Sequence, residues 1–166
     1  MVWVVTVREV VFTVSAITAI ISHAMSSLLL THSAGILDGG NKLFATIGVT
    51  AGELTILSLP LILTFDMCWE RSYTATILAE VVWMFTIGVL WVITGVKAMG
   101  ITSGFFKNCT TGTAAFDSLC LDAQTLSIWS LVTGGLLLAY GAALTGFAVS
   151  QGGDAWTNWK LKVKRK

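Results

Sequence analysis

The sequence predicts an all-α membrane protein, a transmembrane four-helix bundle. Of its 166 residues, 55% are hydrophobic and only 11% are charged, and the mean hydropathy is +0.81. A chain of this composition has too little polar surface to cover a soluble globule of its size. The apolar residues also gather into four long stretches, and each is longer than the roughly 20 helical residues that cross a bilayer core of about 30 Å. We therefore expect a single four-span domain over residues 1–166.

The spans are expected at residues 10–31, 43–67, 75–99 and 123–149. Transmembrane strands would appear as segments of about 10 residues in which apolar and polar side chains alternate, and no such alternation is seen. The spans should therefore be helices, which satisfy every backbone hydrogen bond within the segment. No convincing signal-peptide cleavage site follows the first apolar stretch, so we expect it to be retained as a signal anchor.

The distribution of Lys and Arg predicts the orientation, because cations near span ends are held on the cytoplasmic side. One side of the membrane collects Arg8, Arg71 and the five cations of the basic tail at residues 150–166. The other side has only Lys42, Lys97 and Lys107. We therefore expect both termini to be cytoplasmic, and the first and third connections to lie outside.

The outer connection between the third and fourth spans, expected over residues 100–122, contains Cys109 and Cys120. An oxidising compartment would let them form a disulfide that closes this loop, and a chain-entropy model gives such a bridge about 3 kcal/mol of stabilisation. Two free thiols are the alternative. Asn108 opens an Asn-Cys-Thr glycosylation sequon on the same side, although a bridged Cys109 would hinder its modification. These features fit the plasma membrane or the secretory pathway.

The C-terminal tail combines tryptophans at headgroup level with a cluster of cations. Each cation contributes about 1 kcal/mol of attraction to an anionic leaflet, so the tail is expected on the inner membrane surface with lipids as its partners. A tail that only sets the topology is the alternative, and nucleic-acid binding is not needed to explain it. The residues are Trp156, Trp159, Lys160, Lys162, Lys164, Arg165 and Lys166.

Ionisable residues inside the spans are the candidate functional groups, because each costs at least about 2.5 kcal/mol and usually faces the bundle interior. His23 and Glu53 lie near the middle of the first and second spans. Antiparallel neighbours would bring them to similar depth, so we expect a buried polar pair that serves as a structural clamp or as half of a proton relay. Glu80 is expected to join Asp66 and Arg71 in a cytoplasmic charge cluster that sets the angle between the second and third helices.

Small residues predict where helices pack, because close backbone approach supplies much of the association energy in lipid. The candidate packing residues are Gly48, Gly52, Gly135, Ala139 and Ala143. We expect these residues to pack within the chain, and the alternative is that those of the fourth helix contact a neighbouring subunit.

No enzyme motif is evident. The chain has no C-x-x-C pair, no phosphate-binding Gly loop, no H-E-x-x-H and no nucleophile elbow. Its two histidines, His23 and His32, cannot supply the four axial ligands of a two-haem bundle. We therefore expect no catalytic residues, no metal and no cofactor.

Three features together resemble a known family. Glu80 and Trp83 stand early in the third span as Glu-Val-Val-Trp, the outer loop bears two cysteines, and residues 120–124 lead straight into a fourth span with an early aromatic, Trp129. This order resembles the MARVEL-domain four-span membrane proteins, particularly the small fungal members of the non-classical-export and eisosome-associated type. The resemblance implies a non-enzymatic role in organising membrane domains and handling lipids, with frequent self-association.

We therefore predict a membrane organiser or scaffold that acts through lipid and protein contacts and forms homo-oligomers. One alternative is an accessory or anchor subunit of a larger membrane complex. Another is a small ion or proton transporter in which Glu53 and Glu80 face a wet path.

Overall fold

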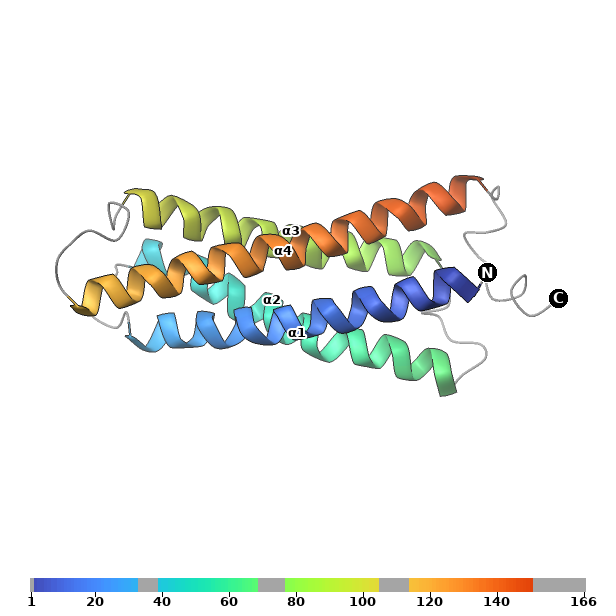
Figure 1. The fold of residues 1–166 in the computed structure, drawn as a ribbon, viewed down its shortest axis with the longest axis horizontal. Helices are drawn as coiled ribbons and strands as arrows, with labels where there is room; N and C mark the ends of the chain where they lie inside the picture. The colour runs from blue at the N-terminus through green and yellow to red at the C-terminus, as the bar shows by residue number, and fades with distance from the viewer. Residues whose placement is uncertain (1, 33–38, 69–76, 105–113, 151–166) are drawn as a thin grey trace.

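The chain forms a bundle of four helices that run alternately up and down (Figure 1). All four are long and apolar enough to cross a membrane, which confirms the all-α, four-span class. The start of α1 and the end of α4 lie at the same end of the bundle (Figure 1). The computed structural model describes α1 (Val2–His32), α2 (Gly39–Cys68), α3 (Ile77–Gly104) and α4 (Ala114–Ser150).

Most helices are longer than the spans expected from the sequence, although α3 begins two residues later than expected. α1 already includes Arg8, and α4 already includes Asp117 and Asp122, so these residues are helical instead of lying in the flanks or the outer loop. The connection between α3 and α4 is correspondingly shorter than predicted. Hydropathy detects only the part of a helix that lies in the hydrocarbon core, whereas the helix itself can continue through the headgroup region.

The closest packing is between α3 and α4, and the least extensive contact between neighbouring helices is that of α2 with α3. Glycines allow the close approach. A Cβ atom added at Gly134 would lie 2.9 Å from the carbonyl oxygen of Gly88 and 3.1 Å from the amide nitrogen of Val92. The two backbones therefore touch at this level, as in other small-residue helix contacts in membranes.

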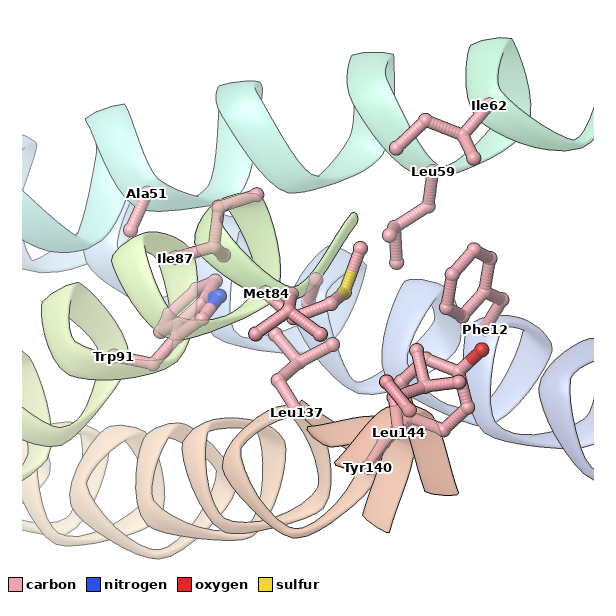
Figure 2. Close-up of a cluster of buried hydrophobic side chains, with 13 residues drawn as sticks. Phe12, Ala51, Leu59, Ile62, Met84, Ile87, Trp91, Leu137, Tyr140 and Leu144 are labelled. Carbon is pink, nitrogen blue, oxygen red and sulfur yellow. The ribbon is translucent and has the colours of Figure 1, made fainter. Parts of the chain in front are cut away.

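Large side chains from all four helices fill the core between the bundle centre and the end where α1 begins. Figure 2 shows Phe12 from α1 and Leu59 from α2 pointing toward Met84 of α3 and Leu137 of α4. A second buried cluster, which includes Leu29 and Phe44, fills the opposite end. The apolar core therefore consists of two clusters, one toward each end of the bundle.

Hydroxyl-bearing residues lie inside the bundle beside the apolar core, and large apolar residues also cover its outer surface, unlike the surface of a soluble protein. The exposed surface carries Ile17, Leu57, Val82 and Ile128. The buried polar residues with hydroxyl groups are Ser15, Thr18, Ser22, Ser26, Thr55, Thr94, Thr102, Ser127, Ser130 and Thr133. This distribution suits a lipid solvent, in which apolar side chains face the acyl chains and many polar groups are retained within the protein.

Candidate functional site

A buried ion pair ties three helices together near the end of the bundle where α1 begins. Arg8 of α1 donates from Nε to Oε1 of Glu80 in α3 at 2.9 Å. The hydroxyl of Tyr140 in α4 donates to the same oxygen at 2.8 Å. The exposed fractions are 7% for Arg8, 4% for Glu80 and 6% for Tyr140, so water and lipid are largely excluded from the contact.

Aromatic rings enclose this ion pair. The ring of Phe12, one helical turn after Arg8, meets Tyr140 edge to face at 5.4 Å between centroids, and Figure 2 shows the two side chains adjacent. The guanidinium carbon of Arg8 lies 5.3 Å from the Phe12 ring centroid, within the range of a cation–π contact. Desolvating two charges is unfavourable, and these extra contacts help to offset it. The arrangement is that of a helix clamp.

The structure gives Glu80 a partner that the sequence did not suggest. Among the described residues Glu80 pairs with Arg8, and together with Tyr140 this contact links α1, α3 and α4. The predicted cluster of Glu80 with Asp66 and Arg71 stays a prediction. Arg71 lies outside the described residues, as does the side chain of Asp66. The sequence holds one signal for Arg8: it precedes Ser15 and Ser22 at seven-residue spacing, which places the three polar residues on one face of α1. The structure shows that this face is buried.

Trp83 follows Glu80 by one turn of α3 and packs, half-buried, against the core. Its indole N–H is buried and has no hydrogen-bond partner within the part of the chain that the structure describes. The family-like pair of Glu80 and Trp83 is therefore adjacent on one helix face, with only Glu80 engaged in a polar contact.

Hydroxyl groups form further contacts between helices near the bundle centre. The indole nitrogen of Trp91 in α3 donates to Oγ1 of Thr55 in α2 at 3.0 Å. Thr55 in turn donates to the backbone carbonyl of Ala51 at 2.6 Å. On the opposite side, the hydroxyl oxygens of Thr18 and Thr133 lie 2.8 Å apart and join α1 to α4. These contacts fix the relative depth of the helices.

Replacing Trp91 by Phe should lower the free energy of unfolding by about 1 kcal/mol, because it removes one interhelical hydrogen bond and keeps most of the buried ring. The measurement is denaturant unfolding in mixed micelles. Thr55→Val should have a similar effect. Because both changes remove the same bond, the double variant should be less destabilised than the sum of the singles. Strict additivity would contradict a direct contact.

His23 and Glu53 are not paired in the structure. The Nδ1 atom of His23 lies 3.3 Å from the carbonyl oxygen of Val49, and its ring packs on Gly52, where an added Cβ would lie 2.7 Å from Nδ1. Glu53 is the next residue, about 100° further round the helix, and it is exposed on the outer surface of α2. The expected buried pair fails because α1 contacts the Gly52 side of α2.

The small residues divide between the interior and the surface. Gly48 faces the Ser26 hydroxyl and Gly52 faces His23, so both lie at the contact of α1 with α2. On α4 the expected intrachain packing is not formed: Gly135, Ala139 and Ala143 are exposed. The contact with α3 instead uses Gly134 and Gly141. The packed face of α4 is therefore rotated by one residue from the predicted one.

The remaining predicted sites fall mostly outside the described residues. Cys120 is buried in α4, but Cys109 and Asn108 lie beyond the described ranges, so the disulfide and the glycosylation stay predictions. The same holds for the aromatic and basic residues of the tail at 151–166. Within the four described helices, no group of three or more His, Cys, Asp or Glu residues is placed to hold a metal ion.

Comparison of the chain with protein-family models, with curated proteins and with solved structures finds no match. The resemblance to MARVEL-domain proteins therefore stays a prediction that rests on the sequence features described above. The geometry sets two features apart as candidates: the buried Arg8–Glu80 pair and the exposed Glu53.

Proposed function

We propose that this protein is a non-enzymatic membrane organiser that self-associates and acts through lipid and protein contacts in the plane of the bilayer. The observation that carries the proposal is the division of its polar groups. Arg8 and Glu80 form an ion pair that holds helices together inside the bundle. Glu53 of α2 and the small residues Gly135, Ala139 and Ala143 of α4 are exposed on the outer surface. Small and polar residues on a lipid-facing surface favour contacts with other transmembrane helices.

The same division favours an organiser over an ion or proton transporter. A path that uses both acids would have to bring Glu53 and Glu80 to one wet passage. Glu53 lies on the outer surface of α2, whereas Glu80 is buried among α1, α3 and α4 and accepts hydrogen bonds from Arg8 and Tyr140. The two acids therefore occupy separate environments, and Glu80 is already engaged.

The proposal includes the topology and the location expected from the sequence. Both ends of the chain are placed in the cytoplasm, with the basic tail on the inner leaflet. A Cys109–Cys120 bridge closes the outer connection between α3 and α4, in the plasma membrane or the secretory pathway. The common end of the bundle at which α1 starts and α4 finishes supports the placement of both termini on one side.

The test is the native mass of the protein, extracted from its own membrane in a mild detergent that retains lipids and partners. We expect a closed homo-oligomer, with a mass that is a multiple of 17.7 kDa plus bound lipid. A fixed stoichiometry with a larger, different protein would contradict the organiser function and make this chain an accessory or anchor subunit.

A further inference from the structure

Glu53 occupies the least favourable position for an ionisable group on a membrane helix. It lies at the middle of the apolar segment Leu43–Thr64 of α2, and its side chain is exposed on the outer surface. Each end of that segment is about 15 Å away at 1.5 Å per residue, further than a Glu side chain can reach. A carboxyl group at this depth is costly unless it meets a polar partner. Glu53 makes no hydrogen bond or ion pair with any other residue that the structure describes, so a partner would approach from outside the chain.

The same face of the bundle carries a complementary group at the same depth. His23 of α1 packs on Gly52, the residue that precedes Glu53, so the imidazole and the carboxyl are level along the bundle axis. The ring is half-buried, and its Nδ1 atom is occupied by the carbonyl of Val49. No hydrogen bond of the second nitrogen, Nε2, is found among the described residues, so Nε2 is the atom that the inferred contact would use.

We infer that the α1/α2 face, defined by His23 and Glu53, is the contact between two copies of this chain, in which Glu53 of each copy pairs with His23 of the other. A two-fold axis along the membrane normal keeps every residue at its own depth, so groups that are level in one copy meet in the pair. The contact is reciprocal and forms two Glu53–His23 pairs, so each of the four residues has one partner. This inference rests on the proposed self-association and assigns it to a surface.

The residues around this pair suit close helix contact. Thr46 and Thr50 are exposed on α2 within two turns of Glu53, and Ala16 and Ser27 are half-buried on α1. Small and hydroxyl-bearing residues let two backbones approach in lipid. The other outward row, on α4, carries no ionisable group that requires a partner. Charge complementarity therefore favours the α1/α2 face.

The experiment measures energy transfer between donor-labelled and acceptor-labelled full-length copies in liposomes, over a range of protein-to-lipid ratios. Glu53→Leu and His23→Phe should each weaken association about tenfold or more, because each removes both pairs from the contact. Phe keeps a ring against Gly52. When the two variants are mixed, one copy supplies His23 and the other supplies Glu53, so association between unlike copies should recover in part. A pair formed within one chain predicts no such recovery.

Two further variants complete the test. Lys97→Leu removes an exposed ionisable group from α3 and should leave association at the wild-type level. Glu53→Gln, which keeps a hydrogen-bonding amide, should fall between wild type and Glu53→Leu. If both single variants associate like wild type, the α1/α2 contact is overturned while the organiser function stands. If mixing restores nothing although both variants have the wild-type helix content, the intermolecular pair is overturned. A wild-type protein that stays monomeric at every ratio overturns the contact and the proposed self-association together.

Discussion

Replacing Glu80 by Ala should lower the free energy of unfolding by about 3–5 kcal/mol, the cost of breaking a buried ion pair by removing one partner. The change removes the Glu80 carboxylate from the Arg8 guanidinium, which is 7% exposed, and it takes away an acceptor of the Tyr140 hydroxyl. Three helices lose their common contact at once. The measurement is unfolding in mixed micelles, followed by circular dichroism.

Two matched variants separate charge from packing. Tyr140→Phe removes the hydrogen bond to Glu80 and keeps the ring contact with Phe12, so it should cost about 1 kcal/mol. The double change Arg8→Met and Glu80→Leu replaces the pair by apolar side chains and should be much milder than Glu80→Ala, because no buried charge is left alone. If Glu80→Ala were no worse than Tyr140→Phe, the ion pair would not be a clamp.

Replacing Gly134 by Val should destabilise the bundle by about 3 kcal/mol, at the upper end of typical overpacking effects. The new Cβ would meet the Gly88 carbonyl oxygen at 2.9 Å and the Val92 amide nitrogen at 3.1 Å. Backbone atoms cannot turn aside as a flexible side chain can, so α3 and α4 have to separate. The separation should also appear as a longer distance between spin labels on these two helices.

The neighbouring glycine is the control. A Cβ at Gly135 would find no atom within 4 Å, so Gly135→Val should change the unfolding free energy by about 0.5 kcal/mol or less. The two variants differ by one position in the same helix and add the same side chain. Equal effects would contradict the close α3/α4 contact.

The sequence predicted the depth of the candidate site residues but not the residues that they contact. Hydropathy and span boundaries placed Glu80 near one end of α3 and placed His23 and Glu53 at a common depth, and the structure agrees with these depths. The partners were missed. Arg8 was interpreted as a topological charge at the membrane surface, because a lone cation before an apolar stretch is the usual pattern for a cytoplasmic flank.

The contact of His23 with α2 and the contact of α3 with α4 were mispredicted for the same physical reason. Consecutive residues on a helix point about 100° apart, so a prediction of depth says nothing about which side faces a neighbour. His23 meets Gly52 and not Glu53, and α3 meets Gly134 and not Gly135. The rotation of each helix depends on where two backbones can approach most closely, and that depends on pairs of residues far apart in the chain.

By itself, the sequence determined the apolar character of the chain, the helical class, the number of spans and the common depth of His23 and Glu53. These follow from composition and from runs of apolar residues, because lipid requires every backbone group to be satisfied within its own segment. Only the tertiary structure decided which polar groups are paired inside the bundle and which face outward. Arg8 is buried against Glu80, and Glu53 is exposed, because the sites of close backbone approach set the rotation of each helix about its axis.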